Sequence, residues 1–163
     1  MKNHKRYYAY FLLMVVLNIS CDKDGNDSFG QMSATINGKE VFLQPDKAKV
    51  YVNPNSLITI LGRNCSEGKV VVILKVPIAV GEYNYGTDGI DIDFFRNSPL
   101  ACDESGNLNK RNVIEGSVSV IEVTNSRIKG TFSLVAASLD PQVIVLNTIE
   151  NGTFDVERGE LFE

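Results

Sequence analysis

The chain of 163 residues contains no tryptophan and a single histidine, His4, which lies close to the N-terminus. Beyond residue 4 the chain therefore has no histidine for a Ser-His-Asp triad, a Cys-His dyad or a His-built zinc site. Three cysteines are also too few for a Cys₄ zinc site. Any enzyme built on this chain is restricted to a carboxylate pair, a lysine or a tyrosine, and we predict a protein that is not an enzyme and needs no cofactor.

Positive charge is also scarce, with 16 Lys and Arg against 20 Asp and Glu. A nucleic-acid-binding protein needs a basic footprint, so we expect no nucleic-acid partner. The hydrophobic fraction of 44% and the charged fraction of 22% are typical of a single packed domain. This balance excludes a disordered, collagen-like or coiled-coil chain.

The first twenty residues have the pattern of a secretory signal peptide. Three cations open the chain: Lys2, Lys5 and Arg6. Residues 7–17 are then wholly apolar or aromatic, a run too short to span a bilayer as a mature helix. The small residue Ser20 precedes Cys21, and this junction resembles the box at which bacterial lipoproteins are cleaved and acylated, for example with palmitate. We therefore predict lipidation at Cys21; an ordinary signal peptide followed by an incidental cysteine is the alternative.

Residues 21–30 are predicted to form a flexible acidic tether, because residues 22–28 read DKDGNDS. This acidity resembles the export signal of surface lipoproteins in Bacteroidota-type bacteria, whereas an Asp directly after the lipidated Cys is associated with inner-membrane retention in enteric bacteria. We predict a lipid anchor in the outer membrane, on its periplasmic face or at the cell surface. Taking the three cations of residues 1–20 from the 16 leaves 13, against 20 acids, which gives a mature net charge of −7.

From residue 31 onward, apolar and polar residues alternate with the period of a β-strand. Asn37-Gly38 supplies the positive φ angles of a tight hairpin turn. Further strands are predicted over 49–52, 57–61, 69–76, 81–86, 90–95, 118–123, 128–134, 143–149 and 153–156, the last two joined around Asn151-Gly152. Residues 97–112 are predicted to form a long exposed loop. About ten short strands without a helix predict one antiparallel β-sandwich or barrel-like domain over residues 31–163.

Cys65 and Cys102 remain after lipidation of Cys21, and outside the cytoplasm an even pair suggests a disulfide. A bridge between them would stabilise the fold by ~4 kcal/mol on the loop-entropy model. Two separate, reduced cysteines are the alternative, because sequence does not place the two Cα atoms within bridging distance.

Five segments carry a resemblance to a known family: 34–39 (ATINGK), 80–83 (VGEY), 116–120 (GSVSV), 128–133 (IKGTFS) and 149–156 (IENGTFDV). On these motifs, residues 31–156 resemble small Bacteroidota-type envelope lipoproteins with an all-β domain of unknown function. Glu150 departs from the small polar residue expected at its position. The resemblance implies no catalytic residues.

Asp88, Asp91 and Asp93 form the densest acidic group of the predicted domain. Asp91 and Asp93 share one face of a strand, and the solvated face of a half-buried strand is the simplest interpretation. They are also a weak candidate calcium site, since alternate aspartates supply two or three of the roughly six to eight oxygens that Ca²⁺ takes. A glycosidase pair would need a partner carboxylate across a cleft.

Tyr51, Tyr83 and Tyr85 offer aromatic surface for a sugar, although core or edge packing is the favoured role. We predict a lipid-anchored envelope protein with a binding or structural accessory role, its partner an envelope protein or glycan. Alternatives are a glycan- or calcium-binding module, an envelope inhibitor of a basic enzyme and, least favoured, a carboxylate hydrolase.

Overall fold

The computed structural model describes residues 30–46, 48–51, 57–66, 69–96, 110–138 and 144–162. The predicted signal peptide and the predicted tether as far as residue 29, with Cys21, lie outside this part of the chain. The described residues form strands, turns and bends, and no helix among them has the length and apolar character needed to cross a membrane.

Ten strands follow one another along the described chain: β1 (Gln31–Ile36), β2 (Lys39–Pro45), β3 (Ala48–Tyr51), β4 (Leu57–Asn64), β5 (Val70–Pro77), β6 (Gly81–Asn84), β7 (Asp91–Phe95), β8 (Lys110–Val123), β9 (Arg127–Ala137) and β10 (Leu146–Phe162). The predicted all-β fold is confirmed. Three of the strands are long, because β8, β9 and β10 have 14, 11 and 17 residues.

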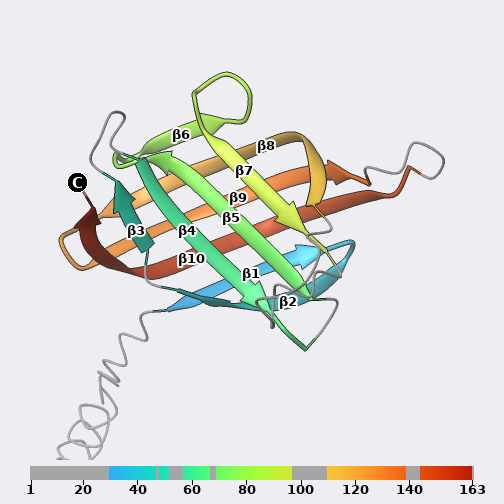
Figure 1. The fold of residues 1–163 in the computed structure, drawn as a ribbon, viewed down its shortest axis with the longest axis horizontal. Coiled ribbons are helices and arrows are strands. Elements are labelled where there is room, and N and C mark those ends of the chain that lie inside the picture. The colour runs from blue at the N-terminus through green and yellow to red at the C-terminus, as the bar shows by residue number, and fades with distance from the viewer. Residues whose placement is uncertain are drawn as a thin grey trace, which may run out of the picture.

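Eight strands pair in a closed antiparallel circuit, in the order β1-β2-β4-β5-β7-β8-β9-β10 and back to β1. The two remaining strands are short. β3 lies between β4 and the end of β10, parallel to β10, and β6 pairs with β8 beyond the contact of β8 with β7. The result is a barrel in which the long strands β8, β9 and β10 cross behind β4, β5 and β7 (Figure 1).

Side chains fill the interior of this barrel, because every second residue of each strand points inward. The inward-facing residues that are fully buried include Ile58, Ile60, Leu74, Ile92, Phe94, Ile128 and Phe154. Glycines make room for the largest of them. A Cβ at Gly152 would lie 2.5 Å from the carbonyl oxygen of Phe132 and 2.7 Å from its ring, so Phe132 packs directly on the β10 backbone.

The two Asn-Gly pairs have different outcomes. Asn37-Gly38 forms the predicted hairpin turn between β1 and β2, with φ angles of 50° and 79°. The turn predicted at Asn151-Gly152 is wrong: β10 runs through it as a bulge, with Asn151 at φ 50°. The chain stays extended there because β10 pairs with β9 on one side and with β1 on the other.

The predicted loop over 97–112 is also too long, because Lys110, Arg111 and Asn112 belong to β8, where Lys110 pairs with Phe95 and Arg111 with Phe94. Residues 97–109 lie outside the described chain. The sequence from 97 to 112 is polar, but pairing with β7 and β9 extends the strand into it.

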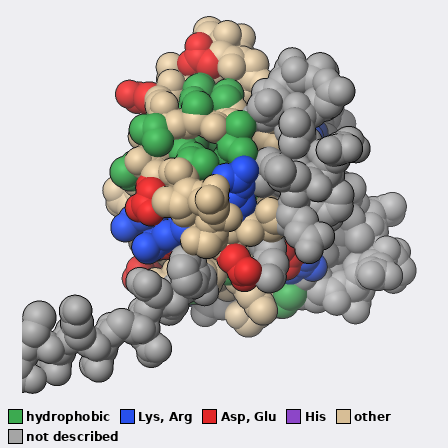
Figure 2. Space-filling view, turned by 90° about the vertical axis from the view of Figure 1, so that its left-hand side faces the viewer, with side chains coloured by type: hydrophobic (Ala, Val, Ile, Leu, Met, Phe, Trp, Pro, Cys, Tyr) green, Lys and Arg blue, Asp and Glu red, His purple; other side chains and the backbone are tan. Residues whose placement is uncertain are grey.

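The barrel has two ends with different surfaces. At one end the described chain enters β1, where the Gly30 N–H donates to the Asp155 carbonyl, close to the turn between β8 and β9. Val80 and Ile121 are exposed at this end, and Figure 2, which views the molecule from this side, shows hydrophobic side chains gathered on the surface. The Asn37-Gly38 turn lies at the opposite end.

Candidate functional site

The predicted acidic group is divided by the structure. Asp91 and Asp93 face outward from β7 and meet two lysines from neighbouring strands: Lys75 Nζ lies 2.8 Å from Asp91 Oδ2 and 3.9 Å from Asp93 Oδ2, and Lys110 Nζ contacts Asp93 Oδ1. The hydrogen bond from Lys75 to Asp91 raises the pKa of Lys75, and the hydrogen bond from Lys110 to Asp93 raises the pKa of Lys110. Two carboxylates and two ammonium groups leave this cluster without the negative charge that would attract Ca²⁺.

Asp88 does not join that cluster, because it closes the turn after β6. Its Oδ2 accepts from the Asn84 backbone N–H at 2.6 Å, and its own N–H donates to the Asn84 carbonyl at 3.1 Å. The described residues contain no group of three or more His, Cys, Asp or Glu side chains placed to hold a metal ion. The geometry therefore favours the solvated strand face over the weak calcium candidate.

Tyr83 and Tyr85, the two described tyrosines of the predicted set, do not form an exposed platform. Tyr83 and Tyr85 pack against the core, and the Tyr83 hydroxyl donates to the Ala79 carbonyl at 3.0 Å. The side chain of Tyr51 lies outside the described residues. Core packing, the role favoured from sequence, agrees with these contacts.

The structure describes only one of the two cysteines of the predicted disulfide. Cys65 is exposed directly after β4, and Cys102 lies outside the described residues. The Cys65–Cys102 bridge, like lipidation at Cys21, stays a prediction. Mass spectrometry of the unreduced chain tests it: a bridged peptide supports it, and two alkylated thiols contradict it.

A polar surface lies on the outer face of β6, β8, β9, β10, β1 and β2. Strand register places six outward-facing residues in one transverse row: Glu82, Ser119, Thr131, Thr153, Ser33 and Phe42. Phe42 ends the row with 70% of its surface exposed. Ser117 and Ser133 form the next rung, with their hydroxyl oxygens 3.1 Å apart.

Three shallow open hollows, of about 430, 460 and 330 Å³, follow this surface and share lining residues. Ser117 and Ser133 line the first two, and Thr153 lines the second and third. We call the three hollows together the serine–threonine trough. Short hydroxyl side chains form its floor, so the longer side chains beside them stand above it.

The charge of the trough has one sign. Among the described lining residues the ionisable ones are Glu82, Glu115 and Glu150, with no Lys or Arg. Its hydroxyl groups meet one another: the Ser117 and Ser133 oxygens lie 3.1 Å apart, and the Ser33 and Thr153 oxygens 3.0 Å apart. Hydroxyl and carboxylate groups at one surface can bind hydroxyl groups or cations.

Sequence reasoning missed the trough, although the sequence carried a signal for it. Residues 117–119 (SVS) and 131–133 (TFS) each alternate hydroxyl and apolar side chains, which places the hydroxyls on one face of a strand. Only the register of β8 with β9, in which Ser117 lies opposite Ser133 and Ser119 opposite Thr131, joins them into one surface.

Comparisons of this chain with protein-family models, with curated proteins and with solved structures found no match.

Proposed function

We propose that this protein is a lipid-anchored, non-enzymatic binding protein of the cell envelope that recognises a neutral glycan in its serine–threonine trough. The observation that carries the proposal is the row of hydroxyl side chains that crosses four strands and ends at the exposed ring of Phe42.

Sugar hydroxyls both donate and accept hydrogen bonds, and so do the Ser and Thr hydroxyls of the trough floor. The carboxylates of Glu82 and Glu150 add strong acceptors at its edges. An aromatic ring presents an apolar face on which a pyranose ring stacks, and Phe42 supplies one at the end of the row. An anionic glycan is disfavoured because the part of the trough that the structure describes has three carboxylates and no Lys or Arg.

The test is affinity electrophoresis of the full chain, purified in detergent, through gels that contain neutral polysaccharides such as β-glucan, xylan or mannan. We expect at least one gel to retard the wild-type chain. Thr131→Lys, which fills the trough, and Phe42→Ala, which removes the ring, should both restore free migration, whereas Asn125→Lys in the β8–β9 turn should not. Equal retardation of the four proteins, or none of the wild type, would contradict the proposal.

The three trough carboxylates favour a second candidate, a basic envelope protein such as a lysozyme-like enzyme that this protein inhibits. Opposite charge speeds encounter, and salt weakens the effect. Hen lysozyme is a suitable probe. An association rate that falls with salt, and falls again in Glu82→Gln with Glu150→Gln, would favour this candidate over the glycan.

Membrane attachment is tested separately through Cys21. We expect Cys21→Ala to leave the membrane fraction or to remain unprocessed, because the cysteine would supply the thiol that is acylated. Processing and membrane partition identical to wild type would refute the anchor while leaving the trough proposal standing.

A further inference from the structure

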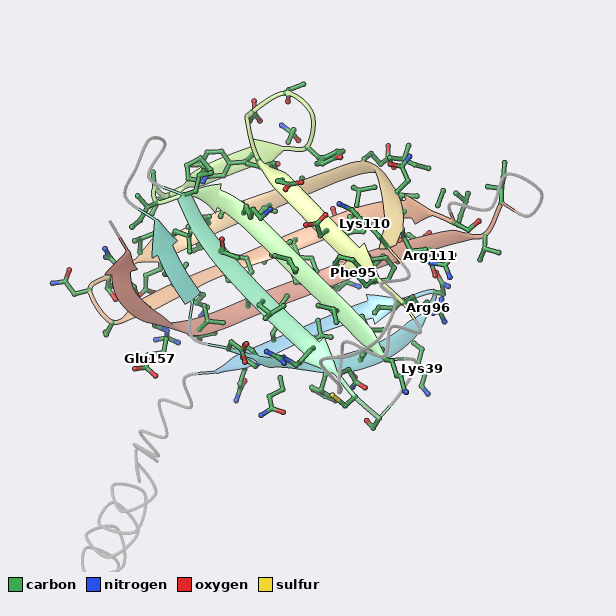
Figure 3. The ribbon with its side chains drawn as sticks, viewed as in Figure 1. Lys39, Phe95, Arg96, Lys110, Arg111 and Glu157 are labelled. Carbon is green, nitrogen blue, oxygen red and sulfur yellow. The ribbon has the colours of Figure 1, made fainter. Side chains whose placement is uncertain are left out.

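The barrel end that carries the Asn37-Gly38 turn has an unusual inward-facing set. Along β7 the inward positions run Ile92, Phe94 and then Arg96, and along β8 Val113 is preceded by Arg111. On β10 the inward position before Ile149 is Asn147, which is fully buried. We call Arg96, Arg111 and Asn147 the cationic mouth; Figure 3 labels both arginines at this end, with Lys39 from β2 at the same side.

Hydrogen bonds join part of this set across the barrel end. Arg96 Nη1 donates to Asn147 Oδ1, which links the end of β7 to the start of β10. Asn37 Nδ2 also approaches Asn147 Oδ1, at 3.5 Å, while Asn37 Oδ1 accepts from the Thr148 N–H at 2.9 Å. Two donors converge on Asn147 Oδ1, so the Asn147 amide is fixed with its oxygen toward them and its Nδ2 away from them.

Two buried donors are then left over. Asn147 Nδ2 and Arg111 Nε are both buried, and neither has a hydrogen-bond partner among the described residues. Leaving a buried donor unsatisfied is costly, and more so when the donor is charged, so such groups call for an acceptor. Among the described residues, no Asp or Glu occupies an inward-facing position at this end of the barrel.

Strand geometry places the leftover donors within reach of one small ligand. Asn147 pairs with Ala136, and Ala136 pairs with Val113, the inward neighbour of Arg111. Two interstrand spacings of about 4.8 Å therefore separate β10 from β8, a span that the Arg111 side chain covers. The buried side chains of Phe94 and Ile149 fill the barrel beneath, so the ligand sits at the rim without an acyl chain inside.

We propose that the cationic mouth binds a phosphate group. Its donors come from three places, the residue after β7, β8 and β10. A tetrahedral phosphate presents oxygens in several directions, whereas a carboxylate presents two in one plane. The mouth lies at the end opposite to Gly30, where the described chain enters the barrel, which favours a soluble phosphate over a headgroup of the anchoring membrane. This site is separate from the serine–threonine trough and does not depend on it.

The experiment measures the Tm and a calorimetric titration of the full chain in detergent with inorganic phosphate, chloride keeping the ionic strength constant. We expect phosphate to raise the Tm and to bind at one site, with acetate much weaker. Arg111→Gln and Asn147→Leu should each weaken binding about tenfold or more. Arg111→Lys keeps the charge without Nε and should also weaken it, whereas Lys129→Gln on the outer face of β9 should bind as wild type.

The Tm of each variant without phosphate shows whether it is folded, so a folded Arg111→Lys or Asn147→Leu suffices for the test. A second arm replaces phosphate with mixed micelles of phosphatidic acid or, as control, phosphatidylcholine. A response to phosphatidic acid alone supports the phosphate site with a lipid as its source. No Tm rise in either arm, or equal rises in wild type and Arg111→Gln, would overturn the proposal.

The chain's own acids between Arg96 and Arg111 are Asp103 and Glu104, and they provide a further check. Phosphate binding should be of similar affinity in wild type and in the double variant Asp103→Asn, Glu104→Gln. If phosphate binds only the double variant, these carboxylates occupy the mouth and the proposal of an external ligand is wrong.

Discussion

The two Asn-Gly pairs of this barrel have the same sequence and nearly the same backbone angle at the asparagine, yet one reverses the chain and the other does not. Asn37 and Asn151 both have a φ of 50°. At Asn37-Gly38 the glycine also has a positive φ, and β1 turns into β2. At Asn151-Gly152 the glycine does not, and β10 continues between β9 and β1. A turn signal is therefore a local preference that pairing on both sides of a strand overrides.

Of the changes at the two Asn-Gly pairs, Gly152→Ala should cause the largest loss in the free energy of unfolding. Its Cβ would meet the Phe132 carbonyl oxygen at 2.5 Å and the Phe132 ring at 2.7 Å, so β9 and β10 would have to separate. We expect a loss of about 2–4 kcal/mol in the free energy of unfolding, measured by urea denaturation. Thr153→Ala, at the exposed neighbouring position, is the control, and equal losses in the two variants would contradict the packing argument.

Replacing the asparagines is expected to have the next largest effect. Asn37→Gly keeps the positive φ but removes the acceptor of the Thr148 N–H and the contact with Asn147, so it should cost about 1–2 kcal/mol. Asn151→Gly also keeps the positive φ, at an exposed position on the bulge. It should change the free energy of unfolding by only a few tenths of a kcal/mol. Thermal unfolding of both variants tests this, and a reversed order would refute it.

Gly38→Ala isolates backbone strain, because a Cβ at Gly38 meets no atom within 4 Å while its φ of 79° disfavours any L side chain. We expect a loss of about 1 kcal/mol. The loss should be smaller than that of Gly152→Ala. Hydrogen exchange should show the opening confined to the β1–β2 turn, and exchange spread over β9 and β10 would be evidence against this interpretation.

The smallest predicted effect is a loss of stability in acid, at the part of β10 that follows the bulge. Arg127 forms a paired hydrogen bond with Asp155, with Nε 2.6 Å from Oδ1, and this lowers the pKa of Asp155 below its ordinary 3.8. Because the folded pKa is depressed, the stabilisation is present above the unfolded pKa and is lost as the pH falls through the lower folded value. We expect a loss of at most about 1 kcal/mol between pH 5 and pH 2 that is absent in Asp155→Asn.

Most of the fold follows from local alternation in the sequence, and most of the two proposed sites does not. The pattern Met32, Ala34, Ile36 correctly gives β1 and its buried face. Asp91 and Asp93 were correctly expected on one face, but their lysine partners come from β5 and β8, which only the register reveals. The bulge at Asn151 was missed because its cause is pairing with β1, more than a hundred residues away.

The cationic mouth was missed for a related reason. Residues two apart on a strand share a face, which relates Arg96 to Phe94 and Arg111 to Val113. The inward direction of both arginines could therefore be predicted from the sequence. Asn147 lies far from both in the chain, and closure of the barrel brings it to Arg96. A charged residue in phase with a buried face is thus a useful signal for the rim of a barrel.

The pairing of β1 with β10 has a consequence for how the protein folds. These are the first and last strands of the described chain, and Gln31 lies opposite Asp155. A chain delivered from its N-terminus therefore cannot close the circuit until its last strand arrives, and the contact that closes it spans most of the sequence. Folds dominated by such distant contacts fold slowly and expose unpaired strands while they wait. We expect the docking of β10 to limit the rate of refolding. We also expect a chain truncated before residue 146, which lacks this strand, to stay unfolded and dependent on chaperones.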